Sequence, residues 1–176
     1  HSVSTSSMGR LFDGVAALLG VCVEAEYEAH GPIAMEALLQ RDARLVDAYA
    51  YSLDDMKGVL QIDPSPLIRE LLADLAAGID VAHISRRFHS TVVDMVCAVC
   101  VRMRQAHGVQ QIVLSGGVFL NEFLLVNTLL RLRALGFPVY CHRQVPTNDG
   151  GVALGQVAVA HAIISLSQGV PCPPTP

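Results

Sequence analysis

QIVLSGGVFLNEFLLVNTLLRLRALGFPVYC, residues 111–141, is the stretch that decides the fold. Gln111 to Leu114 is a short β-rich run, Val118 to Leu135 has the apolar pattern of a helix, and Pro138 to Cys141 is β-rich again. Gly136 separates the helix from the second strand. This order predicts a βαβ unit with a right-handed crossover and two neighbouring parallel strands. The sequence therefore predicts an α/β domain.

The remainder of the chain adds mostly helices. Met8 to Gly20 carries a wide apolar stripe, which is typical of a helix that packs against a core. We expect further helices over Ile33 to Leu39, Pro64 to Ala77, Asp80 to His107 and Gly151 to Leu166, with short strands near Val46 to Ser52 and Val59 to Ile62. Residues 1–168 are expected to form one domain, followed by a proline-rich, disordered tail over 169–176.

The composition excludes several classes of protein. Hydrophobic residues make up 52% and charged residues 16%, which excludes a disordered chain and predicts exposed apolar surface with self-association. A net charge of -4 without a basic stripe argues against a nucleic-acid partner. The longest apolar stretch is interrupted by Gln156 and His161 and is shorter than the ~20 residues that span a bilayer, so we expect no membrane segment. Five cysteines at irregular spacings favour a reducing compartment, and we expect a cytoplasmic protein.

Two glycine-rich loops are the clearest candidates for a ligand site. Ser115-Gly116-Gly117 follows the first strand of the βαβ unit, and Asn148-Asp149-Gly150-Gly151 follows the second. If the strands are neighbours, both loops open on the same edge of the sheet, where ligands of parallel α/β sheets bind. Glycine permits positive φ and lets phosphates approach backbone N–H groups at a helix start. The alternative is that these glycines only make turns, which would suit a binding or interaction module.

Two carboxylates are further candidates for contacts with a ligand. Asp149 is either a hard oxygen ligand for a cation beside phosphates or the cap of the last helix, although Asn148 is an equally capable cap. Asp13 lies on a helix face of small residues, where it is either a hydrogen-bond acceptor for two ribose hydroxyls or a solvated side chain. The sequence contains no Walker-type loop or dinucleotide fingerprint, so P-loop and Rossmann proteins lose support.

Several motifs together resemble one enzyme family. Ser6-Ser7-Met8-Gly9-Arg10-Leu11-Phe12-Asp13, followed by Val15-Ala16-Ala17-Leu18-Leu19-Gly20, resembles the S-S-x-G-R-L-F-D-A-V-A-A-L-L-G of the HypF carbamoyltransferases. Leu114 to Asn121 resembles that family's L-S-G-G-V-F-x-N, and Pro146 to Gln156 resembles its P-x-N-D-G-G-x-x-L-G-Q. Arg87-Phe88-His89 is similar to its R-F-H. The resemblance runs from Ser6 to about Ala162.

The resemblance implies a fold and a set of roles. The fold would be the C-terminal lobe of an actin-like ATPase (ASKHA) domain, helix-rich with a small mixed sheet that ends in the parallel βαβ unit. Asp13 matches a ribose-binding carboxylate, Asn121 a nucleotide-contacting amide and Asp149 a metal ligand. The full set of nucleotide-binding residues implied is Gly9, Asp13, Glu28, Ser115, Gly116, Gly117, Asn121 and Gly150; no catalytic residue is assigned.

The implied reaction is transfer of a carbamoyl group from carbamoyl-adenylate to the C-terminal cysteine of a HypE-type acceptor protein, toward the cyanide ligands of nickel-iron hydrogenase. The cofactors implied are ATP or carbamoyl-adenylate and a divalent metal, Fe or Zn, shared with a preceding lobe that supplies two histidines. The resemblance implies that this chain is a piece of a longer enzyme and is inactive by itself. A carbamoyltransferase acting on a small-molecule hydroxyl is the alternative within the same superfamily.

One departure from the family concerns the candidate site. Where the family reads Y-E-G-Q-A-A, this chain has Tyr27-Glu28-Ala29-His30-Gly31-Pro32. A glycine of the implied nucleotide pocket has thus become Ala29, and we expect its methyl group to crowd a bound sugar.

Overall fold

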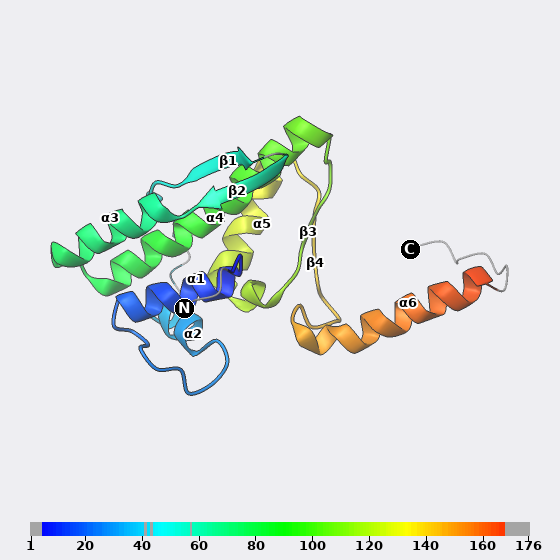
Figure 1. The fold of residues 1–176 in the computed structure, drawn as a ribbon, viewed down its shortest axis with the longest axis horizontal. Helices are drawn as coiled ribbons and strands as arrows, with labels where there is room; N and C mark the ends of the chain where they lie inside the picture. Colours follow the sequence, from blue (N-terminus) through cyan, green and yellow to red (C-terminus); the bar gives the residue numbers. More distant parts are fainter. Residues whose placement is uncertain (1–4, 41, 43, 57, 168–176) are drawn as a thin grey trace.

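The long helix α4 (Val81–His107) is the element against which much of the chain packs (Figure 1). The computed structural model describes residues 5–40, 42, 44–56 and 58–167. In chain order the elements are α1 (Met8–Leu18), α2 (His30–Ala37), β1 (Ser52–Met56), β2 (Val59–Asp63), α3 (Ser65–Ala76), α4, β3 (Ile112–Leu114), the 3₁₀ turn η1 (Gly117–Leu120), α5 (Glu122–Ala134), β4 (Val139–Cys141), the 3₁₀ turn η2 (Asp149–Gly151) and α6 (Val152–Ser167). The expected tail over 169–176 lies outside the described residues.

Local signals in the sequence explain both ends of α4. The carboxylate of Asp80 accepts a hydrogen bond from the backbone N–H of His83, which satisfies a donor of the first turn. Gly108 adopts the left-handed conformation, with φ of 69°, and ends the helix. Between these ends, residues such as Ile84, Phe88 and Val93 are fully buried. The expected helix from Asp80 to His107 is confirmed.

Helices α1 and α2 pack closely against each other. The side chain of Ser7 accepts a hydrogen bond from the backbone N–H of Arg10 and begins α1. A Cβ atom at Gly31 would lie 3.0 Å from the Cβ of Ala16, which is tighter than most Cβ contacts, so glycine favours the close approach of the two helices. Part of the small-residue face of α1, at Ala16, therefore contacts α2 and is closed to a ligand. The part that contains Gly9 and Asp13 stays half-exposed.

The strand expected from Val46 to Ser52 is wrong for residues 46–51, because backbone N–H groups of this segment bond to side chains of α4 and not to a neighbouring strand. The backbone N–H of Val46 donates to Oγ of Ser90 at 3.1 Å. The backbone N–H of Tyr49 donates to Oγ1 of Thr91 at 2.8 Å. Side-chain hydroxyls thus take the place of a neighbouring strand, and the antiparallel pairing of β1 with β2 begins only at Ser52.

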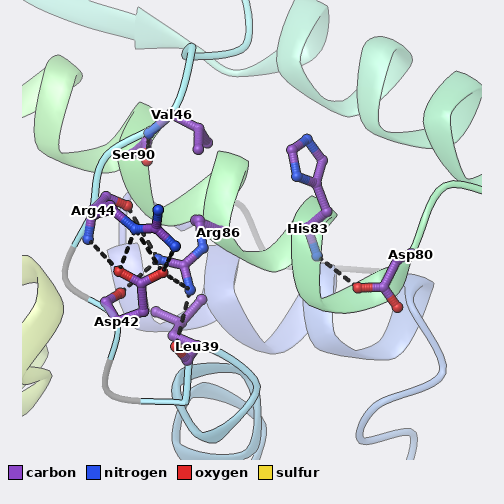
Figure 2. A network of polar contacts seen from close by, with 8 residues as sticks. All are labelled: Leu39, Asp42, Arg44, Val46, Asp80, His83, Arg86 and Ser90. Atoms are coloured by element: carbon purple, nitrogen blue, oxygen red, sulfur yellow. Dashed lines mark hydrogen bonds and ion pairs between the residues drawn. The ribbon is translucent and has the colours of Figure 1, made fainter.

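Figure 2 shows how the residues that precede this segment are held on α4. The guanidinium of Arg86 donates to the backbone oxygens of Leu39, Asp42 and Arg44 and pairs with the Asp42 carboxylate at 3.4 Å. The neighbouring Arg44 side chain lowers the pKa of Asp42 to about 2. Arg86 is mostly buried and therefore fixes the chain where it leaves α2.

The βαβ unit is present, with one difference in its helix. β3 and β4 pair in parallel, with Ile112 opposite Val139 and Leu114 opposite Cys141. The expected helix from Val118 to Leu135 is interrupted at Asn121, whose backbone is extended with φ of -68° and ψ of 113°. Asn121 begins α5 as its N-cap, because its side-chain oxygen accepts from the backbone N–H of Leu124.

Helix α6 extends away from helices α1 to α5 (Figure 1). Large apolar side chains are exposed along the helix: Val152, Leu154, Val157, Val159, Ile163 and Ile164. A helix with apolar residues around its circumference is typical of an element that is covered by another chain or domain. Among the residues that the structure describes, no helix combines the length and the apolar character needed to cross a bilayer.

The left-handed backbone conformation of Ala29 can be tested by substitution. Ala29 precedes α2 in the left-handed conformation, with φ of 61° and ψ of 21°, and a Cβ atom is unfavourable there. We expect Ala29→Gly to raise the free energy of unfolding by about 1 kcal/mol, measured by urea denaturation. The matched change Ala34→Gly, inside α2, should lower it by about 1 kcal/mol, because glycine destabilises a helix interior. Equal loss of stability in both variants would contradict this account.

The exposed apolar surface of α6 is a candidate contact surface between copies of the chain. We expect the chain to self-associate, and Val157→Glu to weaken association about tenfold by removing a burial worth about 1.5 kcal/mol or more. Val157 is 65% exposed, and Val23, which is 79% exposed outside α6, offers the matched control Val23→Glu. Sedimentation over a range of concentrations measures the effect. A monomer at every concentration, or an equal effect of both substitutions, would exclude α6 as the contact surface.

Candidate functional site

The two glycine loops are joined to each other beyond the carboxyl ends of β3 and β4. The backbone N–H of Gly116 donates to the backbone oxygen of Thr147 at 2.9 Å. The hydroxyl of Thr147 donates to the backbone oxygen of Gly116 at 3.2 Å. The expectation that both loops open on one edge of the sheet is therefore confirmed. Ser115, Gly117 and Gly150 lie exposed in the same two loops.

Two of these glycines are required by the backbone. Gly116 has φ of 104°, in a region that side chains rarely adopt. A Cβ at Gly151 would lie only 2.7 Å from the backbone oxygen of Pro146, so the second loop also requires glycine there. Gly116 and Gly151 therefore have a turn-forming role, which the sequence left as an alternative. This role does not exclude a ligand, because the backbone of both loops is exposed.

A polar pair that sequence reasoning missed lies at the mouth of these loops. The hydroxyl of Ser115 lies 2.9 Å from Nε2 of His142, and both residues are exposed. Ser115 follows Leu114, and His142 follows Cys141, its partner in the parallel ladder. Residues directly beyond paired positions are neighbours, so the pair follows from the strand register, which the structure provides and the sequence does not.

Asn121 is nearly buried, with 8% of its surface exposed, and its side chain already has two partners. Its Oδ1 caps α5, and its Nδ2 lies 3.1 Å from Nε2 of His89. The amide therefore retains one N–H and one lone pair for other contacts. The structure gives Asn121 a capping role beside the nucleotide contact that the resemblance implies.

His89, which the resemblance matches to the R-F-H motif without a role, is a fully buried histidine of α4. Its Nδ1 lies 2.8 Å from the backbone oxygen of Ser85, and its ring contacts those of Phe12 and Phe123. Burial lowers the pKa of His89 to about 4, against the opposing effect of the Ser85 hydrogen bond. The ring is therefore neutral at neutral pH.

The start of α5 receives a second cap from α2. Oε1 of Glu36 accepts hydrogen bonds from the backbone N–H groups of Glu122, at 2.7 Å, and Phe123, at 3.5 Å. These residues line an open cleft of about 870 Å³ between α2 and α5, and the cleft's lining includes none of the site residues expected from sequence. The carboxylate complements the positive end of the α5 dipole.

Asp13 and Glu28 lie on the α1 and α2 side of the molecule. Asp13 is half-exposed and pairs with Arg10 at 3.1 Å. Its neighbour Phe12 packs on the ring of His89, with centroids 5.1 Å apart, and His89 contacts Asn121. The buried histidine thus joins α1, through Phe12, to the start of α5. Glu28 is exposed in the loop that leads to α2.

Asp149 begins η2, and its neighbour provides the cap. Oδ1 of Asn148 accepts from the backbone N–H of Gly150 at 3.2 Å, while Asp149 is exposed. Within the described part of the chain, no group of three His, Cys, Asp or Glu side chains is placed to hold a metal. The Asp149 carboxylate is therefore exposed and is not the group that caps η2.

A family model described as the second subdomain of the Kae1-like domain of carbamoyltransferases matches residues 1–156. The carbamoyltransferase HypF of Rhizobium leguminosarum bv. viciae is 37% identical over 161 residues, which cover 91% of this chain and 20% of that protein. HypF of Synechocystis sp. is 33% identical over 153 residues, covering 87% of this chain and 19% of that protein. The chain spans about a fifth of the length of these relatives.

Solved structures give the same assignment. A full-length HypF, described as in its phosphate- and nucleotide-bound form, matches with a TM-score of 0.83 and 37% identity over 90% of this chain and 25% of that chain. HypF of T. kodakarensis matches in fold, with a TM-score of 0.72 and 23% identity over 91% of this chain and 20% of that chain. These likenesses bear out the helix-rich, actin-like fold of the Kae1 type. The chain belongs to the HypF carbamoyltransferases, a family of enzymes.

Proposed function

We propose that this chain forms the nucleotide-binding half of a HypF-type active site. Adenine nucleotide, as ATP or carbamoyl-adenylate, binds at the edge of β3 and β4, with the loops around Gly116 and Gly150 against its phosphates. The observation that carries the proposal is the hydrogen-bonded junction of the two loops, which presents exposed backbone at one place. A solved full-length HypF is described as phosphate- and nucleotide-bound, which supports nucleotide binding by a protein of this family.

The ribose is assigned to Asp13. Its carboxylate is half-exposed, on the half-exposed part of the α1 face, and it faces the junction with α2 near Gly31. A carboxylate can accept hydrogen bonds from two hydroxyls at once. Gly9, one turn earlier, leaves room at the same face, and Glu28 lies in the loop before α2. We propose that the methyl group of Ala29 crowds a sugar bound on this side of the site.

The proposed reaction passes a carbamoyl group to the C-terminal cysteine of a HypE-type acceptor. The cysteine thiol gives up its proton to water, and its sulfur forms a bond to the carbamoyl carbon as the bond from that carbon to the adenylate oxygen breaks and AMP leaves. The metal, Fe or Zn, would supply positive charge beside the phosphates. Other parts of the enzyme would provide the remaining metal ligands, cover α6 and bind the acceptor, and the setting is proposed to be the cytoplasm.

Removal of the Asp13 charge tests the nucleotide site. We expect Asp13→Asn to weaken AMP or ATP binding about tenfold, because charge-assisted hydrogen bonds to the ribose are lost. Asp13 is a better test than Asn121, whose replacement would also remove the cap of α5. Asp55→Asn is the matched control, since its oxygen can still accept from the backbone N–H of Gly58 in the β1–β2 hairpin. Calorimetry that finds the same affinity for wild type and Asp13→Asn would refute the assignment.

Neighbouring substitutions separate metal binding from capping at Asp149. In a full-length HypF that carries this segment, Asp149→Asn should lower metal content and carbamoyl transfer at an unchanged melting temperature. Asn148→Ala should do the reverse, because it removes the η2 cap, worth about 1 kcal/mol, and leaves the carboxylate. Metal analysis and thermal melting of both variants measure this. Full metal occupancy in Asp149→Asn would leave no ligand role for this residue.

A further inference from the structure

A chain of buried hydrogen bonds runs from α2 through α4 to the start of α5. The hydroxyl of Ser85 donates to the backbone oxygen of Met35 at 2.9 Å. The backbone oxygen of Ser85 lies 2.8 Å from Nδ1 of His89, whose Nε2 lies 3.1 Å from Nδ2 of Asn121. Oδ1 of Asn121 accepts from the backbone N–H of Leu124 at 2.9 Å. Ser85 and His89 are fully buried.

The acceptor at Ser85 determines which ring nitrogen of His89 carries the proton. A backbone oxygen can only accept, so Nδ1 must be the protonated nitrogen and Nε2 presents a lone pair. That lone pair accepts from the Asn121 amide nitrogen. If the amide rotated by 180°, its oxygen would face the lone pair of Nε2 and its nitrogen would face the N–H of Leu124. Both contacts would then be repulsive.

We propose that His89 is a positioning residue, which fixes the orientation of the Asn121 amide and thereby holds the end of the first glycine loop and the start of α5 in the geometry that binds nucleotide. Asn121 follows η1 directly, and η1 follows Gly116. The second amide N–H of Asn121 then has one defined direction. The link to nucleotide rests on the proposed function, whereas the link between His89 and Asn121 does not.

Two amide substitutions at position 89 distinguish the two ring nitrogens. The longer side chain in His89→Gln places its amide near the position of Nε2 and can still accept from Asn121. The shorter side chain in His89→Asn places its amide near Nδ1 and retains only the contact to Ser85. Both variants lose the same aromatic contacts with Phe12 and Phe123. Asparagine is one methylene shorter than glutamine, so His89→Asn should lower the melting temperature somewhat more. A merely structural role would speed exchange throughout α4 and α5 in proportion to that loss, whereas the positioning role speeds it specifically at Leu124.

The expected results differ between the variants. Hydrogen exchange of the Leu124 amide should be about tenfold faster in His89→Asn and within about threefold of wild type in His89→Gln, as expected for loss of one buried hydrogen bond. AMP affinity should follow the same order. Nitrogen NMR of the wild-type ring should find the proton on Nδ1, and Asn121→Ala should leave Nε2 without its donor, with a shifted resonance.

Several outcomes would overturn the proposal. If Nε2 carries the proton in the wild type, the ring has no acceptor for the Asn121 amide and cannot orient it. Equal exchange at Leu124 in His89→Gln and His89→Asn shows that the ring acts only by filling space. If wild type binds no AMP, the proposed function and the nucleotide part of this inference fail together, and the exchange and NMR results still decide whether His89 orients Asn121.

Discussion

Burial of polar side chains on α4 is the constraint that places the neighbouring elements. A buried donor or acceptor without a partner costs about 1–3 kcal/mol, so each such group of α4 needs a hydrogen-bond partner, either within the helix, as where the hydroxyl of Thr91 donates to the backbone oxygen of Arg87, or on another segment. Ser85 bonds to α2, Thr91 bonds to the segment before β1, and His89 bonds to the N-cap of α5. Within the described residues, no buried side-chain nitrogen or oxygen lacks a partner. The position of the candidate site follows from these contacts, because Asn121 joins the site to the core.

Elements whose ends carry local signals could be predicted from the sequence. Asp80 and Gly108 mark α4, and the apolar runs around Gly116 and Gly136 mark the parallel pair and its crossover helix. These signals act over a few residues, so they are visible without knowledge of the neighbours. The same holds for the two glycine loops, which share one edge because parallel neighbouring strands end at the same side.

Features that depend on distant partners could not be predicted in this way. Residues 46–51 have a strand-like pattern, yet their backbone partners are hydroxyls more than forty residues away on α4. The break at Asn121 depends on a cap that interrupts an otherwise continuous apolar pattern, and the partner of its amide is a histidine 32 residues earlier. The contact between Ser115 and His142 requires the strand register, which composition and spacing do not contain. The family resemblance named site residues but not these contacts.

The hydrogen bond between Glu36 and the start of α5 joins residues 86 positions apart in the chain. Loop-closure entropy grows only logarithmically with length, so a contact over 86 residues costs about 0.9 kcal/mol more to close than one over 32 residues such as His89 to Asn121. The β1–β2 hairpin lies inside the longer loop. Insertions or deletions at the tip of that hairpin therefore change the closure entropy very little. Chain length can vary there during evolution while the ends of α2 and α5 remain joined.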